Sequence, residues 1–245
     1  MPPRLRVIGP GRAGGSLATA LGRAGWDVVG LLGRHDDLTD ALDAVDLLAV
    51  ATPDDVVATV AAEVRPRPRA VIAHLAGSLG LDVLAPHERV AALHPLVSLP
   101  DPEVGASRLA SGAWFAVAGD PIVQRAADDL GGRWFEVADA DRAAYHAAAA
   151  VASNHLVALL GQVERIAAGI GVPPEAYLDL ARTTLDNVAD MGAARALTGP
   201  VARGDWATVA RHLEAIDDEE AAAYRAMAAA ARRLVDGTAL PPHLT

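Results

Sequence analysis

Residues 5–14 read LRVIGPGRAG, an apolar run followed by the turn Gly9-Pro10-Gly11-Arg12-Ala13-Gly14. This glycine spacing is typical of a dinucleotide-binding turn between a strand and a helix. Gly9 allows the tight turn, Gly11 lets the backbone approach a pyrophosphate, and Gly14 allows the helix to pack closely on the strand. We expect a helix from about Ala13 to Arg23, with the pyrophosphate at its N-terminus. The chain has 22 glycines, so the spacing can arise by chance, but the flanking patterns favour the nucleotide interpretation.

The residues after the second apolar run, 26–32, indicate which nucleotide binds. An NAD-binding protein places an acidic side chain here for the ribose hydroxyls, whereas this chain has Gly33-Arg34-His35. The Arg34 guanidinium can pair with a 2′-phosphate that a carboxylate would repel, so we expect NADP. The alternative is that Arg34 is a solvated loop charge and that Asp36 or Asp37 binds the ribose.

Composition limits the class of protein. At 245 residues and 52% hydrophobic content, the chain can bury a sizeable core as one large domain or two small ones. The formal charge of -10 argues against nucleic acid and anionic membrane as partners. No apolar run approaches the ~18–20 residues that span a bilayer, and the first residues do not follow a signal-peptide pattern. We therefore expect a soluble, cytoplasmic protein without a membrane partner.

Two missing residue types exclude whole mechanisms. The chain has no cysteine, which rules out thiol nucleophiles, cysteine-bound zinc and iron–sulfur clusters. It also has no lysine, because all 21 basic residues are arginines. Schiff-base chemistry and a lysine proton donor are therefore impossible. Acid–base chemistry must come from His, Asp, Glu or Tyr, and we predict no metal site.

Strand and helix patterns predict an α/β fold in two parts. Apolar runs separated by helical segments are typical of a parallel sheet covered on both faces. After the first two runs, further strands are expected at 46–51, 70–75, 90–93, 114–118 and 134–137. From about Asp139 the chain is alanine-rich with helical periodicity, broken at 169–174 and 197–200. We predict a Rossmann-type nucleotide-binding domain at 1–138 and an all-α domain at 139–245 for substrate binding and dimerisation.

Polar clusters follow the carboxyl ends of three predicted strands, where ligands of an open parallel sheet bind. The segment Ala51-Thr52-Pro53 is expected near the nicotinamide ribose. The segments from His74 to Ser78 and from His94 to Ser98 follow the next two strands. Each has a structural alternative: either histidine can be a satisfied core or surface residue, and Ser78 can be the N-cap of a helix that begins at Leu79.

Several longer motifs give the chain a family resemblance. They are GPGRAG, HLAGSLG at His74, ALHPLVS around His94, YHAAAAVASNH from Tyr145 to His155, and LTGPVARGD from Leu197 to Asp205. Over nearly its whole length the chain resembles Rossmann-like proteins that carry a C-terminal DUF2520 domain, within the 6-phosphogluconate dehydrogenase-like superfamily. Some members of that family are similar to ketopantoate reductases. The resemblance therefore implies NADPH as the source of hydride.

The wider superfamily suggests residues on the long helix. Its hydroxyacid dehydrogenases and ketopantoate reductases carry a lysine and, four residues later, an asparagine, which one helical turn places on the same face. Asn154 matches the asparagine, but the lysine position is Ala150, so the usual proton donor is absent. His146 lies one turn before Ala150, and the small alanine leaves space for its imidazole or for the substrate.

The His94-Pro95 pair suggests another proton donor. Prephenate dehydrogenases, which are similar in the nucleotide domain, have a catalytic histidine in such a motif and a serine in the preceding loop, matched here by His94 and Ser78. A histidine with a pKa near ~6.5 can donate a proton to an alkoxide and be recharged from water. We therefore rank His94 first as general acid and His146 second.

Residues 198–205 join two predicted helices and are expected to face the same crevice. Arg203 is suited to binding a substrate carboxylate, although a structural salt bridge is the alternative. Asp205 is expected to cap the helix from Trp206 to Ile216. We thus expect an NADP-dependent oxidoreductase that reduces a small carboxylated ketone, with ketopantoate the leading candidate. Asn154 and Ser78 would orient the substrate. The alternatives are an imine reductase similar to pyrroline-5-carboxylate reductase and a non-catalytic NADP-binding sensor.

The alanine-rich helix from about Tyr145 to Gly161 predicts a quaternary structure. Its side chains are too small to fill a core alone, and a segment such as Leu178 to Met191 has a second apolar stripe. We expect a symmetric homodimer built mainly through residues after 138. The alternative is that these helices pack only on one another and on the nucleotide domain.

Overall fold

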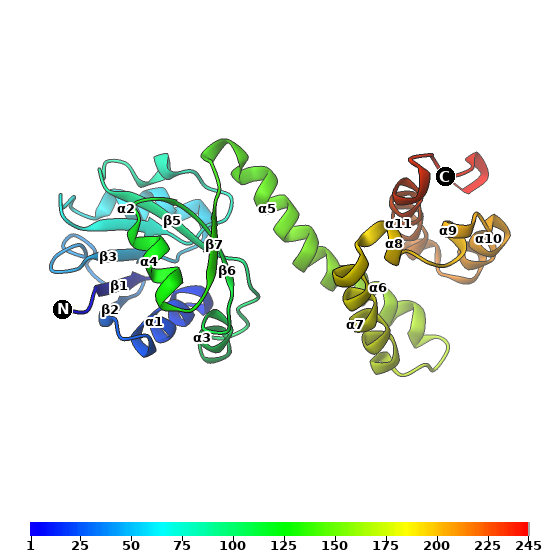
Figure 1. Ribbon diagram of the computed structural model, residues 1–245, viewed down its shortest axis with the longest axis horizontal. Helices are drawn as coiled ribbons and strands as arrows, with labels where there is room; N and C mark the ends of the chain where they lie inside the picture. Colours follow the sequence, from blue (N-terminus) through cyan, green and yellow to red (C-terminus); the bar gives the residue numbers. More distant parts are fainter. Residues whose placement is uncertain (245) are drawn as a thin grey trace. The chain divides into compact units, whose positions relative to one another are not determined.

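The computed structural model describes residues 1–244, which form two compact units (Figure 1). The first is Met1–Ser153 and the second begins at Asn154. The change from strands to helices comes earlier, after the last strand ends at Glu136. The first unit therefore includes one helix beyond its sheet, and this helix supplies part of the candidate site described below.

The first unit is built on a seven-stranded sheet in the order β2-β1-β3-β4-β5-β6-β7. Its strands are β1 (Arg4–Ile8), β2 (Asp27–Leu32), β3 (Leu47–Val50), β4 (Val71–His74), β5 (Val90–Pro95), β6 (Trp114–Gly119) and β7 (Arg133–Glu136). All seven lie where the apolar runs predict them, and the α/β class is confirmed. The expectation of a wholly parallel sheet is wrong at one edge, because β6 pairs with β5 antiparallel. A short connection through α3 brings β6 back beside β5 in the opposite direction.

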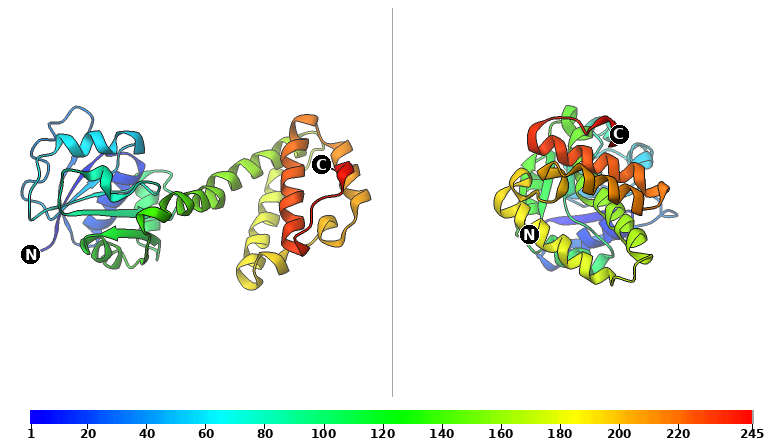
Figure 2. Two further views of the ribbon diagram at one scale, coloured as in Figure 1. Left: turned by 90° about the horizontal axis from the view of Figure 1, so that it is seen from above. Right: turned by 90° about the vertical axis from the view of Figure 1, so that its right-hand side faces the viewer.

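Apolar layers cover both faces of this sheet (Figures 1 and 2). Helices α1 (Arg12–Arg23), α3 (Pro102–Leu109) and α4 (Ile122–Asp129) pack on one face, and α2 (Val57–Glu63), residues 38–45 and the 3₁₀ turn η2 (Leu81–Leu84) pack on the other. Strands β3 and β4 are buried at every position. A strand that is apolar on both sides has no solvent face, which explains its unbroken hydrophobic run.

A helical run from Asp139 to Ala168 follows the sheet. It comprises η3 (Asp139–Asp141), α5 (Arg142–Ala150), a π-helical turn (Val151–His155) and α6 (Leu156–Ala168). By length and composition the run is long enough to cross a membrane, with a mean hydropathy of 1.2 and no buried residue in the window concerned. The expectation that no segment qualifies is therefore wrong. Polar residues interrupt this segment, but its alanines keep the mean hydropathy high.

The second unit is all-helical as far as residue 244, as the sequence predicts. After α6 come α7 (Pro174–Met191), α8 (Ala193–Ala196), α9 (Pro200–Arg203), α10 (Trp206–Ala215), α11 (Asp218–Asp236) and the turn η5 (Pro242–Leu244). The predicted breaks separate α6 from α7 and α8 from α9, and a further break at Gly192 was not predicted. A small core formed by α9, α10, α11 and the segment after α11 includes Val201, Val209 and Leu240.

Candidate active site

The glycine turn after β1 has the geometry that a dinucleotide requires. Gly9 has φ +91°, and a Cβ there would lie 2.7 Å from the Ala51 carbonyl oxygen. At Gly14 a Cβ would lie 2.9 Å from the Ala51 Cβ, so α1 can approach the sheet only without a side chain. Gly11 has no atom within 4 Å of its Cβ position. The first two glycines are fixed by packing, whereas the backbone at Gly11 is open for a ligand.

Other groups around this turn also fit a dinucleotide. Helix α1 begins at Arg12, one residue before the predicted start, and no side chain caps its first N–H groups. The Thr52 hydroxyl, after β3, is buried without a hydrogen-bond partner. Arg34 is exposed and makes no ion pair or hydrogen bond within residues 1–244. The residues present therefore fit a pyrophosphate at α1 and a further anionic group beside Arg34.

Asp36 and Asp37, the alternative ribose ligands, already have partners. The Gly33 N–H donates to Asp36 Oδ2 at 2.6 Å. The Thr39 N–H donates to Asp37 Oδ1 at 2.9 Å, and this contact with Thr39 lowers the pKa of Asp37. Both carboxylates thus stabilise the loop after β2. Arg34 and His35 are polar side chains of this loop that have no hydrogen-bond or ion-pair partner in the described chain.

Strand register brings the polar clusters to one edge of the sheet. Ile8 is paired with Val50, Val50 with His74, and His74 with Ala92, all in parallel. The segments that follow β1, β3, β4 and β5 therefore leave the sheet at the same edge. The strand order reverses between β1 and β3, which is the position where open α/β sheets bind ligands.

His94 near the end of β5 contacts two consecutive residues of α5. Its Nδ1 lies 2.6 Å from the Tyr145 hydroxyl oxygen, and the two ring centroids are 5.5 Å apart at 85°. The His94 and His146 rings are 5.9 Å apart at 87°. Tyr145 also packs edge-on against Phe135 of β7. The structure thus brings together the two histidines ranked as proton donors, and adds a tyrosine that the sequence did not single out.

The surroundings of His94 keep it uncharged. Burial, then the neighbouring His146 and the Arg142 charge, lower the pKa of His94 to about 4. Burial raises the pKa of Tyr145 to about 12, against an opposing effect of Arg142. The expectation of a pKa near the ordinary value of histidine is therefore wrong, because His94 is partly buried beside a guanidinium. At neutral pH the pair consists of a neutral imidazole and a protonated phenol.

Gly77 and Ser78 form the loop opposite these rings. A Cβ at Gly77 would lie 2.7 Å from His146 Cδ2 and 3.0 Å from His94 Nε2, so any side chain there would force the two rings to shift. Ser78 Oγ donates to Asp54 Oδ2 at 2.8 Å, joining the loops after β4 and β3. The alternative role of Ser78 as an N-cap is wrong, because η2 begins at Leu81 and is preceded by Gly80. Ser78 is part-exposed and directly follows Gly77.

Two buried polar residues, His74 and Arg142, lie near the site. His74 is fully buried, and its Nε2–H donates to the Gly80 carbonyl at 3.2 Å. Burial, with the Arg142 charge, lowers the pKa of His74. Arg142 is 1% exposed; its Nε lies 3.4 Å from Asp139 Oδ1, and both terminal nitrogens are buried without a hydrogen-bond partner. His74 therefore has a structural position, and Arg142 places a fixed positive charge near His94 and Tyr145.

The other two predicted site residues belong to the second unit. Asn154 lies in the π-helical turn and is exposed. The expected α-helical spacing between Ala150 and Asn154 is wrong, because α5 ends at Ala150. Arg203 is exposed and is the last residue of the short helix α9, not part of a loop. Asp205 caps α10 as predicted, accepting from the Thr208 N–H at 3.1 Å.

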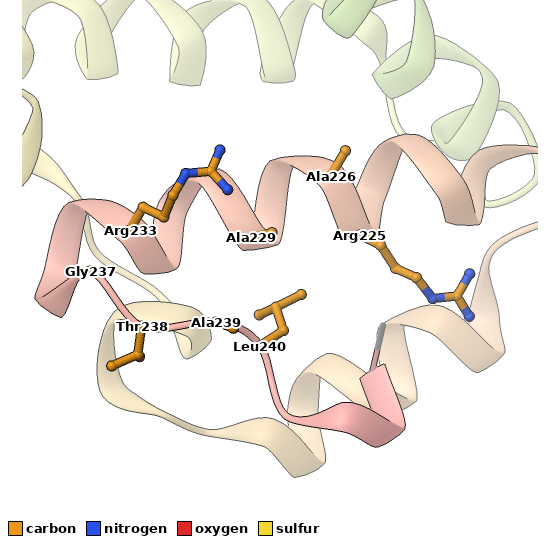
Figure 3. Close-up of a pocket in the computed structure, with 8 residues that line it drawn as sticks. All are labelled: Arg225, Ala226, Ala229, Arg233, Gly237, Thr238, Ala239 and Leu240. Carbon is orange, nitrogen blue, oxygen red and sulfur yellow. The ribbon is translucent and has the colours of Figure 1, made fainter.

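A cavity of about 430 Å³ lies in the second unit between α11 and the segment after it (Figure 3). Its lining residues are Arg225, Ala226, Ala229, Arg233, Gly237, Thr238, Ala239 and Leu240. Figure 3 shows the Arg233 guanidinium pointing away from the segment that carries Leu240. No pair of polar groups converges there as the histidines do in the first unit. Within residues 1–244 no cluster of three metal-ligating side chains occurs.

Fold and site define a chain with a Rossmann-type sheet, a glycine turn suited to a dinucleotide and a helical second unit. Residues 115–231 match the family model "Domain of unknown function (DUF2520)", so this chain carries a DUF2520 domain. No curated protein sequence matches the chain.

Solved structures similar to this chain extend over nearly its whole length. A Bacteroides fragilis protein provisionally described as an NADP oxidoreductase is 18% identical, with 95% of this chain and 98% of that chain covered and a TM-score of 0.78. A Thermotoga maritima protein is 24% identical, with the same coverage and a TM-score of 0.72. A 1-pyrroline-5-carboxylate reductase from Streptococcus pyogenes is 14% identical, with 94% and 98% covered and a TM-score of 0.60. These similarities show the two-part fold.

Proposed function

We propose that the sheet edge of the first unit is the active site of an NADP-dependent oxidoreductase. The substrate is a small carboxylated ketone, with ketopantoate the leading candidate. The observation that carries the proposal is the arrangement at one edge of the sheet: an open glycine turn follows β1, and a neutral histidine that is hydrogen-bonded to a tyrosine lies near the end of β5. A nucleotide site and a proton donor at one edge are the parts that carbonyl reduction needs.

The proposed cofactor residues come from three strand ends. Gly9 to Gly14 would hold the pyrophosphate, Gly33 and Arg34 the 2′-phosphate, and Ala51 to Pro53 the nicotinamide ribose. When bound, NADPH supplies the hydride that reduces the carbonyl carbon. The unpartnered hydroxyl of Thr52 and the unpaired guanidinium of Arg34 support this assignment.

The protein's own residues bind and protonate the substrate. His94 Nε2 makes no hydrogen bond within residues 1–244, so it is free to donate to a carbonyl oxygen. Ser78 would orient the same oxygen by turning its O–H from Asp54 to the substrate, and His146 packs edge-on against His94.

Two other functions remain as alternatives. A cyclic imine arrives as an iminium and needs no acid, and a chain without lysine and with a neutral His94 suits that substrate equally well. A non-catalytic sensor would bind NADPH and transfer no hydride. We prefer the ketone because the hydrogen bond from Tyr145 gives His94 a source of protons that an iminium does not need.

A substrate panel assayed with NADPH tests the proposal. Ketopantoate and other small 2-oxo acids should oxidise NADPH, and cyclic imines such as pyrroline-5-carboxylate should not. Oxidation by the imines alone would establish the imine reductase. NADPH binding without oxidation by any member of the panel would establish the sensor.

We also propose that the helical part forms a symmetric homodimer. None of the 18 residues of α7 is buried, and its exposed apolar side chains include Leu180, at 62%. Val157 of α6 is 69% exposed. A bilayer is a poor cover, since Asp139, Asp141 and Arg142 begin the run and no basic cluster flanks it. A second copy presents an identical apolar face, which a two-fold axis makes self-complementary.

Light scattering across a range of concentrations tests the dimer. We expect twice the 25.2 kDa mass of the chain at micromolar concentration, with an interface above ~1,000 Å². Leu180→Glu should shift the protein toward the monomer, whereas the same change at Leu31 of the first unit, which is 46% exposed, should not. A wild-type protein that stays monomeric would contradict the proposal, and binding to neutral lipid vesicles would identify a bilayer as the cover.

A further inference from the structure

We propose that Tyr145 is a positioning residue that holds His94 as a neutral imidazole with its proton on Nε2. We further propose that Tyr145 returns, through Nδ1, the proton that Nε2 gives to the substrate. The inference deepens the proposed function and rests on it for the second step. The first step, the tautomer of His94, is a property of the protein alone.

The direction of the hydrogen bond determines the tautomer. Tyr145 Oη and His94 Nδ1 are 2.6 Å apart. Within residues 1–244 neither side chain makes another hydrogen bond. An imidazole nitrogen is a stronger acceptor than a phenol oxygen, so the O–H donates and Nδ1 accepts. A neutral imidazole has a single N–H, which must then lie on Nε2.

The other nitrogen of the His94 ring, Nε2, has no partner in the described part of the protein. Nε2 makes no hydrogen bond within residues 1–244, and this atom is not fully buried. It faces Gly77, where a Cβ would lie 3.0 Å away. The absence of a side chain at Gly77 therefore leaves the N–H of His94 accessible. An oriented donor of this kind is useful where negative charge develops on an oxygen.

Tyr145 also solves the problem of the proton balance. A neutral imidazole that loses its Nε2 proton becomes an imidazolate, which is very unfavourable in water. If the Tyr145 O–H bond breaks as a new Nδ1–H bond forms, His94 stays neutral while its Nε2 proton passes to the substrate oxygen. The carbonyl carbon has then gained a hydride and the oxygen a proton, and Tyr145 is left as a phenolate.

The phenolate has a stabilising charge and a route to water. Arg142 is buried, permanently charged, and lowers the pKa of Tyr145 against the effect of burial. Its terminal nitrogens have no acceptor within the described chain, so no nearby carboxylate takes up their hydrogen bonds. Tyr145 itself is only part-buried. Water can therefore restore its proton between turnovers.

A structural role for Tyr145 must be separated from this one, because the ring also packs on Phe135. Tyr145→Phe keeps the ring and removes only the hydroxyl. The chain offers a matched control: Tyr224 Oη lies 2.7 Å from His212 Nδ1, with the rings 5.9 Å apart at 88°, on helices of the second unit. Tyr224→Phe removes the same hydrogen bond away from the site.

The test is ¹⁵N NMR of the histidine rings in the cofactor-free protein, with His94 assigned from His94→Gln. We expect His94 in the wild type to be neutral and protonated on Nε2 at neutral pH. Tyr145→Phe should give a mixture of tautomers, and Tyr224→Phe should leave His94 unchanged. A wild-type His94 that is protonated on Nδ1, or charged at neutral pH, would overturn the proposal whatever the enzyme does.

Turnover tests the second step. Tyr145→Phe should lower kcat for a 2-oxo acid by roughly 100-fold, the lower end of the typical effect of losing a proton-transfer group, with KM and NADPH affinity nearly unchanged. An unchanged kcat would show that the relay is wrong. If the tautomer is as expected but no substrate oxidises NADPH, then the proposed function fails and the structural assignment stands.

Discussion

The chain contains two histidine–tyrosine pairs with nearly the same geometry but very different surroundings. In the first unit His94 Nδ1 lies 2.6 Å from Tyr145 Oη with the rings at 85°; in the second, His212 Nδ1 lies 2.7 Å from Tyr224 Oη with the rings at 88°. Only the first pair adjoins a buried guanidinium, a second histidine and a glycine loop at the carboxyl ends of parallel strands. His212 is on the exposed surface of α10. A hydrogen bond alone therefore does not identify an active site; burial and neighbouring charge do.

The largest difference between the pairs should appear in turnover. His94→Asn removes the proton donor, so we expect kcat for a 2-oxo acid to fall by roughly 10²–10⁴, with NADPH affinity nearly intact. His146→Asn should cost much less, and His212→Asn should have no effect. Full activity of the His94 variant together with collapse of the His146 variant would transfer the role of acid to His146. The assay is steady-state oxidation of NADPH.

The next effect concerns the nucleotide end of the same sheet edge. Arg34→Asp replaces an unpaired guanidinium by a charge that repels a 2′-phosphate, so NADPH binding should weaken by about 2–4 kcal/mol. NADH binding should change far less. Calorimetric titration of both nucleotides measures the ratio, with Arg69→Asp, at an exposed arginine just before β4, as a control outside the turn. An unchanged NADPH-to-NADH ratio would show that Arg34 does not bind the phosphate.

Acid should destabilise the first unit through its buried histidines. The pKa of His94 is about 4 in the folded protein and 6.5 in a free histidine, so the folded state resists protonation. The stability that comes from keeping His94 neutral is fully present above pH ~6.5. It is lost as the pH falls toward ~4, where protonation of the unfolded chain lowers the free energy of unfolding by up to about 3 kcal/mol. The change should be smaller in His94→Asn, where His74 remains, and unaltered in His212→Asn. Urea unfolding at several pH values measures it; equal slopes in all three proteins would contradict the buried, neutral state of His94.

The smallest mutational effect that we predict is at Gly77. An added methyl would lie 2.7 Å from His146 Cδ2 and 3.0 Å from His94 Nε2, which is too close. Both rings must therefore shift, and a shift of under about 1 Å relieves the contact. We expect Gly77→Ala to lower kcat about tenfold and to change the melting temperature little. Gly169→Ala, where a Cβ meets no atom within 4 Å, is the control. Wild-type activity in Gly77→Ala would mean that the space beside His94 is not used.

Much of the fold could be predicted because its signals are local. All seven strands are apolar runs bounded by turns, and the glycine turn after β1 has a spacing that few other structures require. The reversal of β6 against β5 was not predictable, because buried parallel and antiparallel strands have the same apolar pattern. The π-helical turn at Val151–His155 was missed for a similar reason: nothing in its residue types distinguishes it from an α-helix.

The candidate site divides in the same way. His94, His146 and Ser78 were proposed from motifs and strand ends; the rings of the two histidines do pack together, and Ser78 follows Gly77, which lies against both rings. Tyr145 was missed although it precedes His146, since only the packing of α5 against β5 turns its hydroxyl to His94. The lack of lysine was the available signal, because it leaves tyrosine among the few possible proton donors. The burial of Arg142 is a tertiary property that no local pattern contains.

The central claim is that a neutral His94, supplied by Tyr145, protonates the product oxygen, and the pH dependence of kcat tests it most directly. Since the pKa of His94 is about 4 and that of Tyr145 about 12, His94 is neutral and Tyr145 is protonated at every pH well inside this range. We predict a kcat for a 2-oxo acid that is constant from about pH 5.5 to about pH 9. A kcat that falls as the pH rises through about 6.5 would show a charged imidazolium as the acid and would contradict the account.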